Sequence, residues 1–99
     1  MKKIVYTIGS MNFMWDETKR RTNLKRHGLD FADACLVFAG YTLTRPDARF
    51  DYGEARFSTM GLLGVEVVVI AHTETEDTIR VISMRKAERH ERKHFFSSL

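Results

Sequence analysis

Three strand-like segments in the second half of the chain follow one another through very short links, and this arrangement constrains the fold most. The segments are Ala55–Leu62, Val65–Thr73 and Thr78–Arg85. Parallel neighbours need a crossover of about a dozen residues, whereas the links around Gly64 and through Glu74–Asp77 are far shorter. The pattern therefore predicts two consecutive hairpins and an antiparallel meander. The middle strand is almost continuously apolar, which is typical of a central strand covered on both faces.

Helices are predicted before and after the meander. Asp16 is a favourable N-cap residue, and the polar segment after it can run as a helix to His27, where Gly28 is a natural stop. A second helix is expected from Asp30. Its apolar stripe at helical spacing consists of Phe31, Ala34, Cys35 and Phe38. A third helix begins at about Lys86. The predicted fold class is α+β, a mostly antiparallel sheet with two N-terminal helices and a C-terminal helix.

The remaining segments are shorter and less regular. Asn12–Trp15 and Tyr41–Thr44 are candidate strands, and Arg45–Gly53 is expected to be a polar loop that contains the only proline. Met1–Ser10 is interpreted as a leader or fusion-derived segment, because Met11 can serve as a second start and Gly-Ser precedes it. The alternative is a short native strand. Residues 11–99 are then expected to form a single domain.

Composition restricts the function classes. Ninety-nine residues with 43% hydrophobic and 29% charged side chains fit one globular domain with a modest core. The single Cys35 excludes an internal disulfide, and no apolar run approaches the length of a membrane span, so a cytoplasmic location is expected. The net charge of +3 favours an anionic partner without identifying it.

Strand alternation predicts how the arginines of the meander are arranged. With a turn at Leu63-Gly64, Arg56 lies opposite Ala71, and Ala71 lies opposite Arg80. A turn at Gly64-Val65 would slide the register but keep the same residues on each face. The two arginines are thus expected on one face, two strands apart, which would create a hollow suited to phosphate. Arg85 is expected on the other face unless a bulge intervenes. The alternative is that each arginine pairs with a carboxylate such as Glu54.

Other chemical candidates are weaker. The four histidines lack a zinc-ligand pattern, and no nucleotide-binding glycine loop is present, so no metal or cofactor is predicted. His72, His27, Glu54 and Tyr52 are the acid–base candidates. The alternative for His72 is a structural residue at the strand end, and the alternative for His27 is a cap on the helix carbonyls. A basic stripe at helical spacing is expected on the last helix, as an RNA contact, an acidic-partner groove or a solvated face. It consists of Lys86, Arg89, His90 and Lys93.

Four separated blocks of sequence carry a family resemblance. They are WDETKRRTNLKRHGLDFADA, RFDYGEARF, GLLGVEVVVIAHTE and DTIRVISMRKAERHER. In this order they resemble the BrnT family of type II toxins, and the resemblance spans Met11 to Phe96. It implies a small fold similar to the RelE and ParE toxins. It also implies an RNA-cleaving toxin that inhibits translation and growth. The implied partner is a ribbon-helix-helix antitoxin similar to BrnA, with which the toxin represses its own operon through operator DNA.

The same resemblance points to Arg56, Arg80, Ser83, Arg85 and Lys86, and to His72 with Thr73 in the matching block. Together with the acid–base candidates and the basic stripe, this gives the predicted site residues. The predicted catalytic residues are Arg56, Arg80, His72 and Glu54, and the predicted RNA-binding residues are Ser83, Arg85, Lys86, Arg89 and Lys93. The chain departs from the family pattern at Thr75, where a basic residue is common.

The mechanism expected from these residues needs no metal. The ribose 2′-OH would attack the adjacent phosphate, Arg56 and Arg80 would stabilise the developing charge, and His72 or Glu54 would take the proton. Two alternatives remain open. The chain could be a non-catalytic module that binds antitoxin and operator DNA, or it could inhibit a protein target as ParE-like toxins do.

Overall fold

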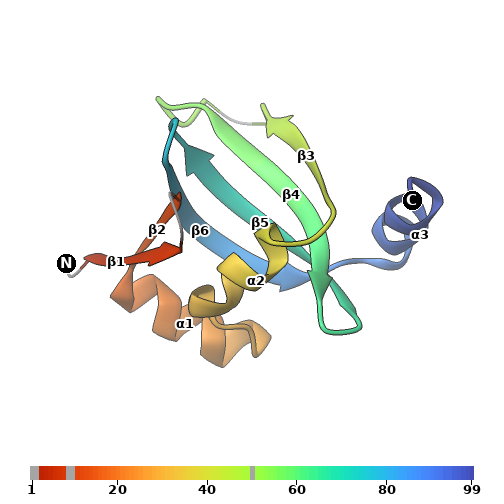
Figure 1. Ribbon diagram of the computed structural model, residues 1–99, viewed down its shortest axis with the longest axis horizontal. Coiled ribbons are helices and arrows are strands. Elements are labelled where there is room, and N and C mark those ends of the chain that lie inside the picture. Colours follow the sequence, from red (N-terminus) through yellow and green to blue (C-terminus); the bar gives the residue numbers. More distant parts are fainter. Residues whose placement is uncertain (1–2, 9–10, 50) are drawn as a thin grey trace.

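The computed structural model describes residues 3–8, 11–49 and 51–99. Over these residues the chain forms six strands, three α-helices and one 3₁₀ turn (Figure 1). In chain order the elements are β1 (Lys3–Ile8), β2 (Met11–Asp16), α1 (Glu17–His27), the 3₁₀ turn Phe31–Asp33, α2 (Ala34–Phe38), β3 (Thr42–Asp47), β4 (Arg56–Leu63), β5 (Glu66–Glu74), β6 (Thr78–Lys86) and α3 (Arg89–Ser97). The predicted α+β class is confirmed.

The strands that the structure describes form one sheet in the order β1-β2-β6-β5-β4-β3. The predicted meander is confirmed, because β4 pairs with β5 and β5 pairs with β6, both antiparallel. The contact between β2 and β6 is the parallel one. The segment Met1–Ser10 contributes β1, which pairs antiparallel with β2 over residues 3–8. Its interpretation as a leader stays a prediction, and residues 1, 2, 9 and 10 lie outside the described part.

Two boundary predictions were wrong. The strand expected over Tyr41–Thr44 extends to Asp47 and includes Pro46, which the polar-loop prediction had excluded. Proline is tolerated there because β3 lies at the sheet edge. The last helix begins at Arg89 rather than near Lys86, because β6 continues through Lys86 and Glu88 then forms a capping box with Glu91.

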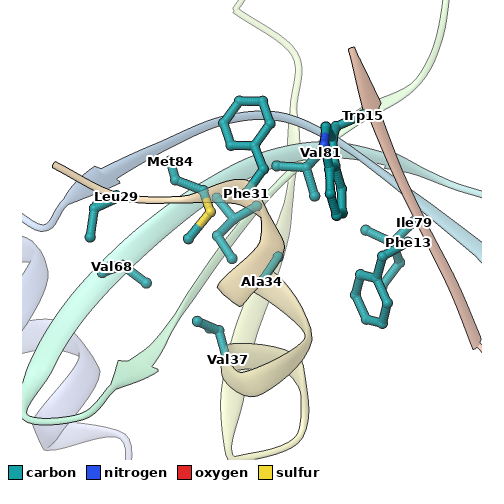
Figure 2. Packing of buried hydrophobic residues seen from close by; sticks show 11 residues of the cluster. Phe13, Trp15, Leu29, Phe31, Ala34, Val37, Val68, Ile79, Val81 and Met84 are labelled. Atoms are coloured by element: carbon teal, nitrogen blue, oxygen red, sulfur yellow. The ribbon is translucent and has the colours of Figure 1, made fainter. Parts of the chain in front are cut away.

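The two faces of the sheet have different coverings. One face, called here the α2 face, carries Val68, Ile70, Val81 and Met84, and packs under α2 and the 3₁₀ turn (Figure 2). Phe31, Ala34 and Val37 enter this core from the helical side and are fully buried. Gly61 permits the close approach, because a Cβ atom there would lie 2.6 Å from Cγ1 of Val37.

The opposite face, called here the α3 face, is covered only at one end. There Val67, Val69 and Met60 form a second cluster with Phe95 of α3. Helix α3 lies beyond the end of β6, away from α1 and α2 (Figure 1). The other end of the α3 face carries polar and charged side chains.

Helix α1 is held by a polar contact rather than an apolar stripe. Leu24, its one large apolar residue, is 39% exposed, whereas Asn23 is buried. The Asn23 amide donates to the Met84 carbonyl at 2.9 Å and accepts from the Met84 amide at 3.1 Å. The side chain thus extends the hydrogen bonding of the β6 edge and anchors the helix there.

Candidate active site

A bulge in β6 decides which side chains share the α3 face. Ala71 pairs with Ser83, but His72 pairs with Val81, so Ile82 is the extra residue. One inserted residue reverses the alternation of side chains beyond it. Ser83 and Arg85 therefore lie on the face that also carries Arg80. The prediction that Arg80 and Arg85 point in opposite directions was wrong for this reason.

Arg56 and Arg80 share the α3 face, as strand alternation predicted. The residue between them is Thr73 rather than Ala71. Thr73 pairs with Arg80, and because Phe57 pairs with His72, the adjacent Arg56 lies opposite Thr73. Arg80 also donates from Nε to Oγ1 of Thr73 at 3.3 Å. The shared face was thus predictable, while the exact register was not.

Glu54 joins the two arginines. Its Oε1 accepts from Nη2 of Arg80 at 2.5 Å and lies 3.5 Å from Nη2 of Arg56. The Arg56 guanidinium also lies over the Tyr52 ring, 3.8 Å from the ring centroid. The predicted alternative, pairing of the arginines with Glu54, is therefore present together with the shared face. One carboxylate lies between two guanidiniums.

These side chains line connected hollows on the α3 face. A hollow of about 110 Å³ is lined by Glu54, Arg56 and Arg80 together with Lys19 of α1. A wider one of about 550 Å³ shares Glu54 and Arg56 with it. We call these lining residues, with Arg45 and Arg85 described next, the arginine groove.

Arg45 and Arg85 extend the groove toward α3. They line a hollow of about 350 Å³ together with Ser58. Arg85 donates to both carboxylate oxygens of Glu91, at 2.7 and 3.0 Å. The Arg85 side chain, through hydrogen bonding, lowers the pKa of Glu91 to about 2. The carboxylate in turn holds Arg85 in place beside the groove.

His72 is not in the groove. Its side chain lies on the α2 face, fully buried, with Nε2 2.6 Å from Oγ1 of Thr59. The rings of Phe57 and Phe38 pack against it at centroid distances of 5.9 and 5.1 Å. Burial lowers its pKa, which favours the neutral imidazole. Its surroundings are those of a core histidine, so His27, Glu54 and Tyr52 remain the acid–base candidates.

The predicted RNA-binding residues are divided among three places. Arg85 lies in the arginine groove, and Ser83 lines a separate hollow between β6 and α1. Lys86, Arg89 and Lys93 are exposed. Because Lys86 belongs to β6 and the helix begins at Arg89, the expected four-residue helical stripe does not exist as such.

Sequence reasoning missed three residues of this region. Arg45 was placed in a loop, although it lies opposite Ser58 in the β3–β4 ladder. Lys19 was read only as part of a polar helix. Glu91 could have been found, because a carboxylate at Glu88 followed three residues later by another is a helix-capping pattern.

A comparison with protein families identifies the chain. A family model described as the ribonuclease toxin BrnT of type II toxin–antitoxin systems matches residues 15–91. The chain belongs to the BrnT toxin family. The match runs from the end of β2 to the first turn of α3, and it includes all the charged residues named above in the arginine groove. A search of curated proteins finds no match.

Membership of the BrnT family makes this chain a ribonuclease toxin with RNA as substrate and an antitoxin as partner. Within the described ranges, no group of three or more His, Cys, Asp or Glu side chains is arranged to hold a metal ion. No helix in the described part is long and apolar enough to cross a bilayer.

Proposed function

We propose that the arginine groove is the site at which this BrnT-family toxin cleaves RNA, by attack of a ribose 2′-OH on the adjacent phosphate. The observation that carries the proposal is the position of Glu54 between the guanidiniums of Arg56 and Arg80. A carboxylate and a phosphate are both oxyanions that guanidinium groups bind through paired N–H donors. The site thus has the charge and the donors for a phosphate.

The two arginines have donors to offer a phosphate. Each guanidinium carries five N–H groups. In the described structure, Glu54 and Thr73 engage three of these ten through the contacts given above. The remaining donors can stabilise the charge that develops on the phosphorane-like transition state.

Glu54 is the proposed general base. It is the carboxylate nearest to both arginines, and its side chain is 38% exposed, so a substrate can reach it. When a phosphate takes the place between the guanidiniums, the Glu54 carboxylate is displaced to the rim, where it can accept the 2′-OH proton. The 2′ oxygen then bonds to phosphorus, the P–O5′ bond breaks, and the departing 5′ oxygen takes a proton from water, which leaves a 2′,3′-cyclic phosphate and a 5′-OH. Arg85 and Arg45 would bind neighbouring phosphates of the strand, and the exposed Lys86, Arg89 and Lys93 would add to the attraction at longer range.

The mechanism predicts a specific chemical test. Purified protein, dialysed against EDTA, should cleave an RNA oligonucleotide and leave a 2′,3′-cyclic phosphate. A matched oligonucleotide with a 2′-deoxy sugar at the cleaved position should stay intact, because the nucleophile is gone. The measurement is separation of the products by gel and mass spectrometry. Cleavage of the deoxy oligonucleotide at that position, or activity that returns only with a divalent metal, would contradict the proposal.

We further propose that the partner is a ribbon-helix-helix antitoxin similar to BrnA, and that the complex represses its own operon. Membership of a type II toxin family supports a protein antitoxin. Inducible expression of the chain alone should inhibit translation and arrest growth, and co-expression of the small neighbouring gene should restore both. Arrest without loss of RNA would instead favour inhibition of a protein target. If the folded protein causes no growth arrest, the result would favour the alternative of a non-catalytic co-repressor that binds antitoxin and operator DNA.

A further inference from the structure

Helix α1 carries two different sets of cations. On one side, Arg20 and Arg21 are paired with Glu17, and Arg20 also contacts Asp30. On another side, three exposed cationic or titratable side chains have no ion-pair partner within the described residues. They are Lys19, Arg26 and His27. All three line one hollow of about 250 Å³ between α1 and β6.

The shape of this hollow, called here the α1 hollow, is fixed by the backbone. Asn23, at its base, bonds both the carbonyl and the amide of Met84. The same side chain also donates to the Leu29 carbonyl at 3.1 Å, which holds the segment after α1. Ser83 and Ile82 of β6 form the opposite wall. Cations on a helix anchored in this way present a surface that is formed before any ligand arrives.

The α1 hollow lies next to the arginine groove. Lys19 and Ile82 line both this hollow and the one that contains Arg56 and Arg80. From Lys19 to Arg26 the helix rises about 10 Å, at 1.5 Å per residue. That length corresponds to roughly three nucleotides of a stacked strand, at about 3.4 Å each.

We propose that the α1 hollow is an RNA subsite that binds the nucleotides next to the cleaved phosphate. The inference rests on the proposed function of the arginine groove. Lys19 and Arg26 bind backbone phosphates about three nucleotides apart, and the Ser83 hydroxyl offers a hydrogen bond from the β6 wall of the hollow. Exposed cations without carboxylate partners favour a polyanionic strand over an apolar protein surface. The subsite would set affinity for longer RNA rather than the rate of the chemical step.

Binding can be measured separately from cleavage. The variants are Arg26→Ala and Lys19→Ala/Arg26→Ala, and the control is Lys25→Ala. Lys25 is an exposed cation of the same helix that does not line the hollow. The probe is a fluorescent twelve-nucleotide RNA with 2′-O-methyl sugars, which lacks the 2′-OH nucleophile and which the proposed chemistry therefore leaves uncut. Fluorescence anisotropy over a salt series gives Kd and its salt dependence for each protein.

The double variant should bind this probe about tenfold or more weakly than wild type, while Lys25→Ala stays within about twofold. The slope of log K against log salt should fall by about 1.4, since each phosphate contact in a single strand contributes about 0.7. With cleavable RNA, Arg26→Ala should raise KM and leave kcat unchanged.

Several results would overturn the subsite. These are equal losses in the double variant and the control, an unchanged salt slope, or weakened binding of antitoxin with unchanged binding of RNA. A wild-type protein that binds the probe through Lys19 and Arg26, yet cleaves no RNA, would support the α1 hollow as an RNA site and refute the proposed function instead.

Discussion

Glu54 is the residue on which the proposed chemistry of the arginine groove depends. Without a carboxylate, two guanidiniums held on one face, from strands on either side of β5, would repel each other. Glu54 contacts both, at 2.5 Å to Arg80 and 3.5 Å to Arg56, and so keeps them together in the absence of substrate. A phosphate can replace it with more acceptor oxygens. The same carboxylate can therefore order the empty site and accept a proton in the occupied one.

Arg85 and Glu91 form a comparable pair whose contribution depends on pH. The Glu91 pKa is lowered from 4.5 to about 2 in the folded protein. A carboxyl with a lowered folded pKa contributes stability that is fully present above its unfolded pKa, near 4.5, and is lost as pH falls toward 2. Glu91→Gln should thus destabilise the protein at neutral pH by about 1.5 kcal/mol, a modest value because Arg85 is 40% exposed to solvent.

Urea unfolding of wild type and Glu91→Gln at about pH 7 and pH 2.5 measures this effect. The difference in free energy of unfolding should shrink at the lower pH. Glu76→Gln is the control, because Glu76 is exposed and its side chain forms no hydrogen bond or ion pair with the residues that the structure describes. A difference that is the same at both pH values, or absent at pH 7, would show that the ion pair does not stabilise the fold.

At the scale of elements, sequence patterns predicted what depends on local spacing. The meander, α1 with its Asp16 cap and Gly28 stop, and the shared face of Arg56 and Arg80 all follow from alternation and capping. The Ile82 bulge could not be read from the sequence, because Thr78–Arg85 has no glycine or other signal of an extra residue. That one residue decides where Arg85 points. His72 was predicted to be catalytic, but its side chain is buried in the core of the α2 face, which the local sequence pattern did not reveal.

At the scale of the whole molecule, the larger apolar core and the proposed RNA site lie on opposite faces of the sheet. The α2 face holds the larger apolar core, and the α3 face holds a smaller cluster at one end and the arginine groove at the other. A net charge of +3 is too small to identify a polyanion binder by itself. The informative feature is that unpaired or substrate-accessible cations lie along one path, from Arg26 through Lys19 and Arg80 to Arg45. Global composition could not reveal such a path.

The most direct test of the account is the rate of RNA cleavage by Arg56→Ala and Arg80→Ala, compared with wild type and Lys25→Ala under single-turnover conditions. Loss of one group that stabilises transition-state charge costs about 10²- to 10³-fold in rate. Each arginine variant should show a fall of that size with an unchanged thermal midpoint, and Lys25→Ala should retain the wild-type rate. Full activity in both folded arginine variants would contradict the assignment of the arginine groove as the catalytic site.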